Sequence, residues 1–348
     1  MEQTQTQTYG LSPGTYRRLS RLADSTGRFS MLAVDQRGSL RRMIGRKTDT
    51  APDAVPDESL RRVKRIVSRA IAPMASGILT DPIYGYPASV DVLGPDVGVL
   101  LANEQTGYRP APTHEEERRS RLLEDWSVEQ TIKAGADAVK LLIYHHPEAS
   151  PETVAHQKNI VETVGAACTK NEVPFILEVM TYTLDGSDKE SAAFARRKPD
   201  LVVRSAESYS DPALNVDLLK VEFPASLKYT EEYQEAPYGR ETVVYDRAAV
   251  EEACSRLDDA AGVPWVILSS GVDIEEFIEN LRLANAAGGS GFLCGRAVWK
   301  HVVDHYPDPQ SMSDYMETEG RSNFRDLLEV NSTALPWYEH RRFTTKRS

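Results

Sequence analysis

Charged side chains interrupt three otherwise apolar stretches of the sequence. Lys140 lies within AVKLLIY, Glu178 lies within FILEVM, and both Lys220 and Glu222 lie within LLKVEFP. Lysine and glutamate are almost never fully buried unless they are paired, because an isolated buried charge is strongly destabilising. These residues therefore indicate either buried salt bridges or a reactive site.

A lysine in such surroundings has a specific reactivity. Burial and a neighbouring cation both disfavour the ammonium form, so they lower the pKa of the lysine. An amine that keeps its lone pair can condense with a carbonyl group to form a Schiff base. A nearby carboxylate can then move protons between a substrate hydroxyl, the carbinolamine and the enamine.

Eight short apolar runs alternate with longer amphipathic stretches along the chain. Such runs are typical of strands that are buried on both faces of a parallel sheet. Alternating strands and helices imply right-handed parallel crossovers, and eight such units predict a (β/α)8 barrel that forms one domain, residues 1–348. The predicted strands are Phe29–Asp35, Gly77–Asp81, Val97–Glu104, Ala138–His145, Pro174–Tyr182, Leu218–Pro224, Pro264–Gly271 and Gly291–Gly295.

The stretches between these runs have the apolar spacing of amphipathic helices. Residues 1–10 are predicted to form a disordered polar tail, and residues 307–348 a helical C-terminal extension. An open doubly wound sheet is the competing architecture, but DQRG follows the first strand where that fold needs a glycine-rich phosphate loop. The predicted helices are Ser59–Ala75, Glu115–Ala134, Pro151–Thr169, Asp246–Ala261 and Ile274–Ala287.

A barrel would bring three of the charged residues to one wall of its cavity. Lys140, Glu178 and Lys220 lie on the fourth, fifth and sixth predicted strands, and neighbouring strands are about 4.8 Å apart. Barrels build their active sites at the carboxyl ends of the strands. A salt bridge without chemistry is the alternative for any one residue, but three on neighbouring strands favour function because buried ions add little stability. Glu222 is interpreted as a partner that balances charge.

The last two predicted strands end in residues that suit an anion. Ser269, Ser270 and Gly271 close the seventh strand, and Gly295 and Arg296 close the eighth. Loops after these two strands commonly bind phosphate in barrels, since backbone N–H groups before a helix attract anions and a guanidinium matches phosphate oxygens. The alternative is a glycine turn beside a surface arginine.

The first predicted strand ends in Asp35, Gln36 and Arg37. These three polar residues are interpreted as groups that recognise substrate hydroxyls and an anion. The alternative is a turn in which Asp35 caps the following helix.

The composition excludes several classes of protein. Lysine and arginine number 41 and aspartate and glutamate 52, which gives a net charge of −11, and 41% of the 348 residues are hydrophobic. That apolar content excludes disorder over the whole length, and the negative charge argues against nucleic acid or an anionic membrane as a partner. No apolar stretch approaches the ~18 residues of a membrane span, and the polar N-terminus does not resemble a signal peptide. A cytoplasmic location is expected, and a homo-oligomer is compatible with these features.

No cofactor or metal site is predicted. The three cysteines are far apart and include no C-x-x-C pair, and no zinc-protease, P-loop or nucleophile-elbow motif is present. His145 and His146 would point to opposite faces of a strand, and all histidines are interpreted as loop or surface residues. The run Glu115–Arg119 is interpreted as a solvated helix face.

Several segments together resemble the tagatose 1,6-bisphosphate aldolase family, whose members are Schiff-base (class I) aldolases of the (β/α)8 class. The segments follow the expected order and span most of the chain, and DQRG, LKVEFP and CGRAVW in combination are specific. Sulfofructose-phosphate and deoxyketose-phosphate aldolases resemble the same family, so they remain alternatives for the substrate. The matching segments are AVDQRGSLRRMI, VKLLIYHHP, ILEVMTY, LLKVEFP, LSSGV and GFLCGRAVW.

The resemblance implies a role for each matching residue. Lys220 would form the Schiff base, Glu178 would be the acid/base carboxylate, and Lys140 would contact the substrate and tune the site. Asp35 and Gln36 match the recognition motif of the first strand. The phosphate-binding end is matched by Ser269 or Ser270, Gly271, Gly295 and Arg296, with Ser270 standing where the family pattern leads us to expect alanine.

The leading hypothesis is therefore a metal-independent aldolase that cleaves a ketose 1-phosphate or 1,6-bisphosphate, with D-tagatose 1,6-bisphosphate as the first choice. Dihydroxyacetone phosphate and glyceraldehyde 3-phosphate would be the products. Two other hypotheses fit the same phosphate site: a non-catalytic barrel that binds sugar phosphates and signals to a partner, and a barrel enzyme such as an isomerase that uses a base without an imine.

Overall fold

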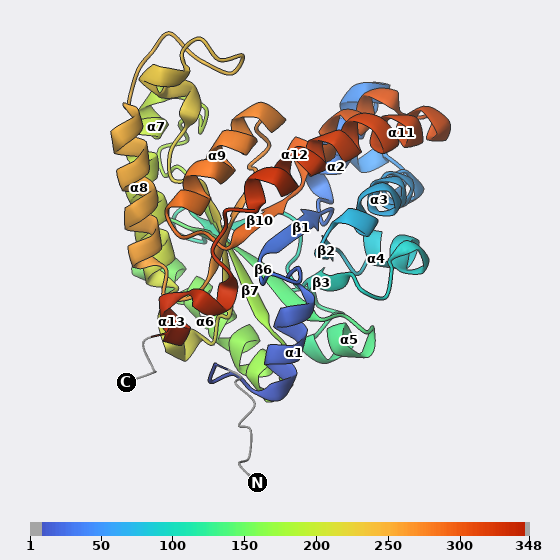
Figure 1. Ribbon diagram of the computed structural model, residues 1–348, viewed down its shortest axis with the longest axis horizontal. Helices are drawn as coiled ribbons and strands as arrows, with labels where there is room; N and C mark the ends of the chain where they lie inside the picture. The colour runs from blue at the N-terminus through green and yellow to red at the C-terminus, as the bar shows by residue number, and fades with distance from the viewer. Residues whose placement is uncertain (1–8, 345–348) are drawn as a thin grey trace.

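The computed structural model describes residues 9–344 and places eight parallel strands in a closed barrel (Figure 1). Around the barrel the strands follow the order β1-β10-β9-β8-β7-β6-β3-β2, so strands consecutive in the chain are neighbours in space. The predicted (β/α)8 fold and all eight predicted strands are confirmed. The barrel strands are β1 (Phe29–Ala33), β2 (Gly77–Thr80), β3 (Gly98–Ala102), β6 (Ala138–His145), β7 (Phe175–Thr181), β8 (Leu218–Glu222), β9 (Trp265–Leu268) and β10 (Gly291–Cys294).

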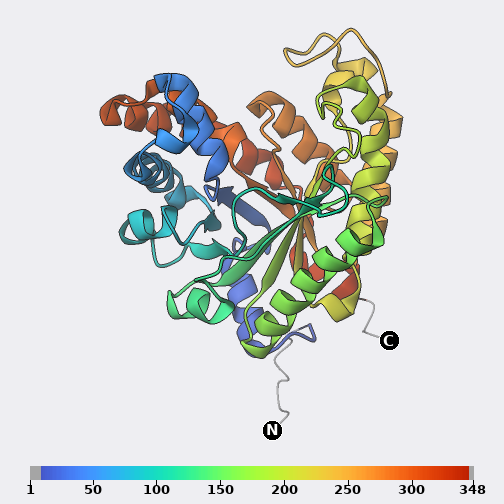
Figure 2. The ribbon, with the colours of Figure 1, turned by 180° about the vertical axis from the view of Figure 1, so that it is seen from behind.

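Helices cover the outside of the barrel (Figures 1 and 2). Four of the five predicted helices are confirmed, and so is the helical C-terminal extension. Ser150 caps α6, where its hydroxyl accepts a hydrogen bond from the N–H of Thr153 at 3.3 Å. The helices are α1 (Pro13–Arg21), α2 (Gly38–Thr48), α3 (Asp57–Ile71), α4 (Gly85–Ser89), α5 (Val128–Lys133), α6 (Pro151–Lys170), α7 (Ala192–Ser208), α8 (Arg247–Ala260), α9 (Ile274–Ala286), α10 (Arg296–Trp299), α11 (Pro309–Tyr315), α12 (Arg321–Asn331) and α13 (Arg341–Thr344).

The two ends of the described chain meet at the amino-terminal end of the barrel (Figure 1). Leu19 of α1 shares one apolar cluster with Trp337, Phe343 and the side chains that fill the barrel. Of the predicted disordered tail, residues 1–8 lie outside the described residues. The ring of Tyr9 is packed, with its centroid 5.9 Å from that of Trp337.

The predicted helix Glu115–Ala134 is wrong over most of its length. Between β3 and α5 the chain makes an excursion across the barrel strands (teal in Figure 2) that contains a short antiparallel hairpin of β4 (Arg109–Pro110) and β5 (Arg118–Arg119). The helix begins only at Val128.

Long-range contacts explain this difference from the local pattern. Glu117 is buried, and its carboxylate accepts hydrogen bonds from the N–H and the hydroxyl of Ser150, both at 2.6 Å. The guanidinium of Arg118 lies 5.5 Å from the ring centroid of Tyr144 in β6. The run Glu115–Arg119 is therefore not a helix face: Glu115 and Glu116 are exposed, but Glu117 and Arg118 hold this segment against the barrel.

The helices that the sequence prediction lacks include two long ones of the outer ring, α2 and α7. Pro199 lies inside α7, and an internal proline normally kinks or ends a helix. Helix α7 persists because it packs along α8 and against β7 and β8.

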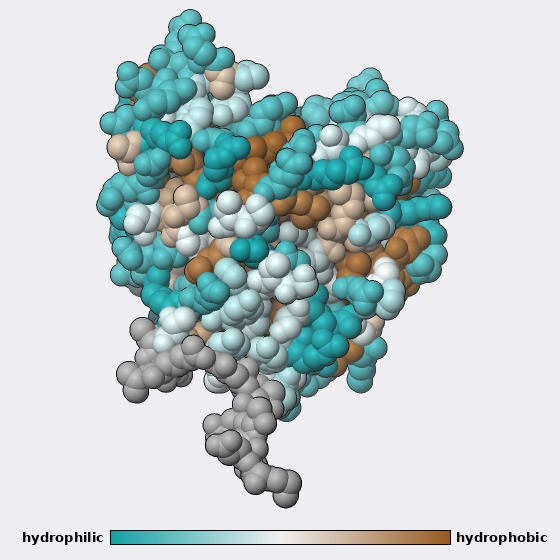
Figure 3. Space-filling view, viewed as in Figure 1, coloured by the Kyte–Doolittle hydropathy of each residue, from teal (hydrophilic) through white to brown (hydrophobic). Residues whose placement is uncertain are grey.

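Hydrophilic side chains cover most of the face seen in Figure 3, and apolar side chains gather near its middle. Between residues 9 and 344, none of the helices combines the length and the apolar character needed to cross a lipid bilayer.

Asp217 at the start of β8 makes the stability of the barrel dependent on pH. Its carboxylate accepts a hydrogen bond from the N–H of Phe175 at 3.0 Å, and burial raises its pKa from 3.8 to about 6. Because the folded-state pKa of Asp217 is raised, the contribution of this residue to the free energy of unfolding falls as pH rises from about 4 to above 6, by up to about 3 kcal/mol. We expect the melting temperature of Asp217→Asn, relative to wild type, to increase over this range and then stay constant. A constant difference from pH 4 to 8 would contradict this prediction.

Candidate active site

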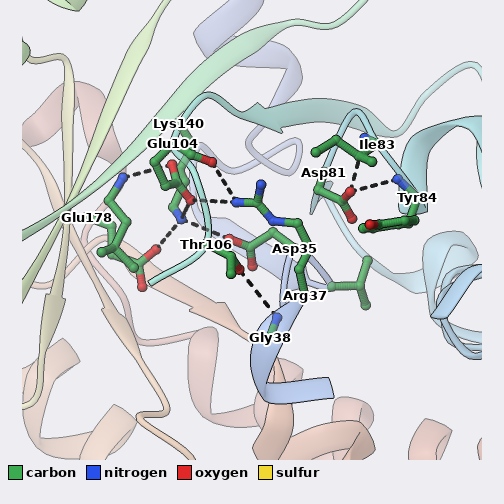
Figure 4. A network of polar contacts seen from close by, with 12 residues as sticks. Asp35, Arg37, Gly38, Asp81, Ile83, Tyr84, Glu104, Thr106, Lys140 and Glu178 are labelled. Atoms are coloured by element: carbon green, nitrogen blue, oxygen red, sulfur yellow. Dashed lines mark hydrogen bonds and ion pairs between the residues drawn. The ribbon is translucent and has the colours of Figure 1, made fainter. Parts of the chain in front are cut away.

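Lys140 lies at the centre of a buried ionic cluster at the carboxyl end of the barrel (Figure 4). Its ammonium group donates hydrogen bonds to Asp35 at 2.8 Å and to Glu104 at 2.7 Å, and it lies 2.8 Å from Glu178 Oε2. The side chain of Lys140 has no solvent exposure. The three carboxylates come from the ends of β1 and β3 and from β7, so closure of the barrel brings them together.

The charges in this cluster fix the protonation state of its members. Burial acts to lower the pKa of Lys140, but Asp35, Glu104 and Glu178 outweigh burial and raise that pKa well above its ordinary value. Burial acts to raise the pKa of Asp35, but Lys140 and Lys220 outweigh it and hold that pKa well below its ordinary range. Lys140 is therefore an ammonium ion at neutral pH, and Asp35 is a carboxylate.

Lys220 lies next to the cluster, between it and a cavity at the carboxyl end of the barrel. Glu178 and Lys220 are paired in the register of β7 and β8, and the amine of Lys220 donates to Glu178 Oε2 at 2.9 Å. One carboxylate oxygen thus lies between the two amino groups. The predicted placement of Lys140, Glu178 and Lys220 on one wall agrees with this geometry.

Glu104 is a member of the cluster that the sequence analysis did not single out. Its second carboxylate oxygen accepts the N–H of Leu142 at 3.0 Å, and its carbonyl oxygen accepts a hydrogen bond from Arg37 at 2.7 Å. The rule applied to the other strands, that a polar residue at the carboxyl end of an apolar run is a site candidate, would have found it at the end of VGVLLANE.

A cavity of about 280 Å³ opens above Lys220 and Glu178. Its size is close to the lower limit for small-molecule sites, roughly 300 Å³. Lys140 lies beneath the cavity floor. Of the other predicted site residues, those that line the cavity are Asp35, Gln36, Arg37, Glu178, Lys220, Ser269, Ser270, Gly295 and Arg296.

The loops after β9 and β10 meet at one end of this cavity. Ser270 and Gly271 both have positive φ angles, 50° and 93°, which turn the backbone sharply. A Cβ atom on Gly271 would lie 3.2 Å from the guanidinium carbon of Arg296, so glycine allows the loop to pass close to that group. Burial lowers the pKa of Arg296. The predicted anion-binding residues are thus brought together, although Gly271 does not itself line the cavity.

Arg37 has a structural contact in addition to its place in the cavity wall. It is buried, and its guanidinium holds the carbonyl of Glu104. The neighbouring Gly38 N–H donates to the hydroxyl of Thr106 at 3.3 Å. These contacts join the loop after β1 to the segment after β3, and Arg42, Gln105 and Thr106 line the same cavity as Ser269.

Glu222 lies outside the Lys140 cluster. Its carboxylate accepts hydrogen bonds from the N–H and the hydroxyl of Thr181 at 2.7 and 2.6 Å and pairs with Lys189 at 2.8 Å. These contacts agree with its interpretation as a residue that balances charge.

The interpretation of all histidines as loop or surface residues is wrong for His145, which is a buried residue of β6. His146 and His340 lie in loops as expected, but they are buried too. His145 Nδ1 lies 2.9 Å from the hydroxyl of Ser205, and burial lowers the pKa of His145 to about 4. Within residues 9–344, no group of three or more histidine, cysteine, aspartate or glutamate side chains is arranged to hold a metal ion.

Comparison with known proteins decides the family. A model of the DeoC/LacD family aldolases matches residues 29–301. The chain belongs to this family of aldolases, which are carbon–carbon lyases. The resemblance identified from the sequence motifs is thereby confirmed.

Curated relatives match this aldolase over nearly its whole length. It is 36% identical to the tagatose 1,6-diphosphate aldolase of Lactococcus lactis subsp. lactis, over 92% of this chain and 96% of that protein. It is also 36% identical to tagatose 1,6-diphosphate aldolase 2 of Enterococcus faecalis, over 94% and 97% of the two chains.

Solved structures share the fold of this aldolase. A Schiff-base-forming fructose-1,6-bisphosphate aldolase superposes with a TM-score of 0.54 at 16% identity, covering 91% of this chain and 99% of that chain. Fructose-bisphosphate aldolase from Plasmodium falciparum gives a TM-score of 0.62 at 16% identity, covering 93% and 94%.

Proposed function

We propose that this aldolase cleaves D-tagatose 1,6-bisphosphate to dihydroxyacetone phosphate and glyceraldehyde 3-phosphate through an imine on Lys220. The observation that carries the proposal is the amine of Lys220, which lies on the cavity floor 2.9 Å from the Glu178 carboxylate. The printed names of the curated relatives support the choice of sugar.

The surroundings of the two lysines support Lys220 as the nucleophile. Three carboxylates surround the ammonium group of Lys140 and stabilise its positive charge. The nitrogen of Lys140 therefore has no lone pair with which to attack a carbonyl. Lys220 contacts one carboxylate, Glu178, and faces the cavity. Transfer of a proton from Lys220 to Glu178 gives a neutral amine beside a carboxylic acid that can return the proton.

The proposed reaction uses these two groups in turn. The amine of Lys220 attacks the C2 carbonyl, and Glu178 donates the proton with which the carbinolamine hydroxyl leaves as water. The Glu178 carboxylate then accepts the proton of the C4 hydroxyl as the C3–C4 bond breaks, and the iminium takes up the electron pair as an enamine. The aldehyde leaves, C3 is protonated, and water hydrolyses the iminium to release dihydroxyacetone phosphate and free Lys220.

The remaining cavity residues are proposed to bind the two ends of the sugar. Ser269, Ser270, Gly271, Gly295 and Arg296 would hold the C1 phosphate through hydroxyl, backbone and guanidinium groups. Asp35 and Gln36 would contact substrate hydroxyls, and Lys140 would keep Asp35 and Glu178 in place. Arg37 and Arg42 also line the cavity, and we assign them to the aldehyde end of the substrate.

A coupled assay for dihydroxyacetone phosphate tests the choice of substrate. We expect D-tagatose 1,6-bisphosphate to give the highest kcat/KM among ketose 1,6-bisphosphates, ketose 1-phosphates, deoxyketose phosphates and sulfofructose 1-phosphate. A higher kcat/KM for sulfofructose 1-phosphate or a deoxyketose phosphate would reassign the substrate. Ligand binding without any cleavage would contradict an enzymatic role.

Treatment with EDTA tests the proposed independence from metals. The iminium nitrogen acts as the electron sink, so we expect the rate of cleavage to be unchanged after incubation with EDTA and gel filtration. A metal-dependent aldolase treated in parallel should lose its activity. Loss of activity that added divalent cations restore would contradict the proposal.

We also propose that the enzyme works in the cytoplasm. Cys168, Cys254 and Cys294 are free and buried, which suits a reducing compartment.

A further inference from the structure

A second buried ion pair lies behind the cluster of Lys140. Lys64, from the middle of α3, places its ammonium 2.8 Å from Asp81 Oδ2 just after β2, and the two side chains are 1% and 0% exposed. The neighbouring inward residues of α3 are apolar, among them Leu60, Val63 and Val67. A charged pair at this place is unexpected, because a buried ion pair often adds no stability over apolar side chains of similar volume.

The pair is tied to the backbone on both sides. The ammonium of Lys64 donates a hydrogen bond to the carbonyl oxygen of Val34, the residue directly before Asp35. Asp81 accepts hydrogen bonds from the N–H groups of Ile83 at 3.1 Å and Tyr84 at 2.8 Å (Figure 4). Lys64 thus joins the end of β1 to the end of β2.

The backbone at the start of α4 packs closely against the Lys64–Asp81 ion pair. A Cβ atom on Gly85 would lie 2.1 Å from the hydroxyl oxygen of Thr80, 3.1 Å from Asp81 Oδ2 and 3.2 Å from Cδ of Lys64. Real Cβ atoms essentially never approach within 3.0 Å of another group, so only glycine lets the start of α4 come this near.

The charge of Lys64 also acts on Asp35. Four cationic groups face the Asp35 carboxylate from different elements: Lys140 on β6, Lys220 on β8, Lys64 on α3 and Arg296 after β10. Unlike the other three cations, Lys64 neither lines the cavity nor contacts the other two carboxylates of the site, Glu104 and Glu178. Lys64 therefore acts on Asp35 in two ways: through the electrostatic effect of its positive charge, and through its hydrogen bond to the carbonyl of Val34.

We propose that Lys64, held by Asp81, is a positioning residue for the aldolase reaction. By fixing the backbone at Val34, it keeps the Asp35 carboxylate on Lys140 in the geometry that the cleavage step needs. The inference rests on the proposed function, because it assigns Asp35 a part in the aldolase site.

A double-mutant cycle with Asp35 tests this role. The ion pair is replaced by Lys64→Met together with Asp81→Asn. This replacement leaves no unpaired buried charge, and the amide oxygen of the asparagine can still accept the hydrogen bonds from the N–H groups of Ile83 and Tyr84. We expect kcat for D-tagatose 1,6-bisphosphate to fall by about tenfold, with KM changed by less than about twofold. When Asp35→Asn is already present, the same replacement should change kcat by less than about twofold, because the group through which Lys64 acts is gone.

Arg65→Met is the matched control on the same helix. Arg65 forms an exposed ion pair with Asp91 at 2.5 and 2.8 Å and points away from the site. We expect it to leave kcat unchanged in both backgrounds. Thermal melting and circular dichroism establish that each variant is folded.

Two results would overturn the inference. One is a pair replacement that leaves kcat at the wild-type value. The other is a loss that multiplies with the loss caused by Asp35→Asn, since this would be the mark of a general structural effect. If the double replacement does not fold, Lys64→Leu with Asp81→Asn, which also removes the hydrogen bond to Val34 and leaves no unpaired buried charge, takes its place in the cycle with the same criteria.

Failure of the proposed function gives a different result. In that case the wild-type enzyme itself would not form a reducible adduct on Lys220. If only the positioning role is wrong, the wild-type enzyme still forms the adduct on Lys220 and cleaves the sugar, and only the double-mutant cycle departs from the expected result.

Discussion

Lys220→Met is expected to lower kcat for sugar-phosphate cleavage by roughly 10³-fold or more, because a thioether cannot form the imine. Among the described residues that line the cavity, Lys220 is the only lysine. The variant should fold, since Glu178 keeps its ion pair with Lys140 at 2.8 Å and is not left as an unpaired buried charge.

Borohydride trapping followed by mass spectrometry checks this prediction. With substrate present, the wild-type enzyme should carry a reduced adduct on the peptide that contains Lys220, and the variant should carry none. Lys189→Met is a suitable control, because Lys189 pairs with Glu222 outside the cluster and its loss should leave trapping intact. Cleavage by Lys220→Met at the wild-type rate would contradict the proposed mechanism.

Glu178→Gln is expected to lower kcat by about 10²–10⁴-fold, because an amide cannot take the proton of the C4 hydroxyl. The carboxylate oxygen of Glu178 lies between the amines of Lys140 and Lys220, so its loss also removes the acceptor for the proton of Lys220. Imine formation should be slower, but the final amount of borohydride adduct on Lys220 should approach that of the wild type.

Glu222→Gln is the matched control for this variant. Glu222 lies on β8, two residues beyond Lys220, but its carboxylate bonds to Thr181 and Lys189. We expect its substitution to affect kcat far less than Glu178→Gln does. Equal losses for the two variants would indicate a general effect of charge on the barrel, and that result would remove Glu178 from its proposed role.

The periodicity of the sequence was sufficient to predict the barrel and its central charged residues. The eight apolar runs became the eight strands, because a strand buried on both faces must be apolar along its whole length. Lys140, Glu178 and Lys220 were visible as exceptions to that rule. Their separation along the chain did not hide their proximity, since strands consecutive in a barrel are neighbours.

Residues outside the strands were harder to find. Glu104 lies two residues beyond the end of β3, and only its place at the carboxyl end of an apolar run marks it as a site candidate. Lys64 lies on an amphipathic helix, where a lysine normally faces water. The strand β5 and the residues between it and α5 were predicted as helix, because the contacts that hold the hairpin come from Ser150 on one side and from the ring of Tyr144, 5.2 Å from that of Tyr108, on the other.

The class of fold, the strands, and the two lysines and one glutamate in the centre of the site could be read from the order of the residues. Which lysine is held as an ammonium ion depends on the folded structure. That state depends on the through-space distances from Lys140 to Asp35, Glu104 and Glu178, and an electrostatic energy at a few ångströms in a buried site outweighs any preference of the residue itself. These distances exist only once segments more than 30 residues apart are folded together.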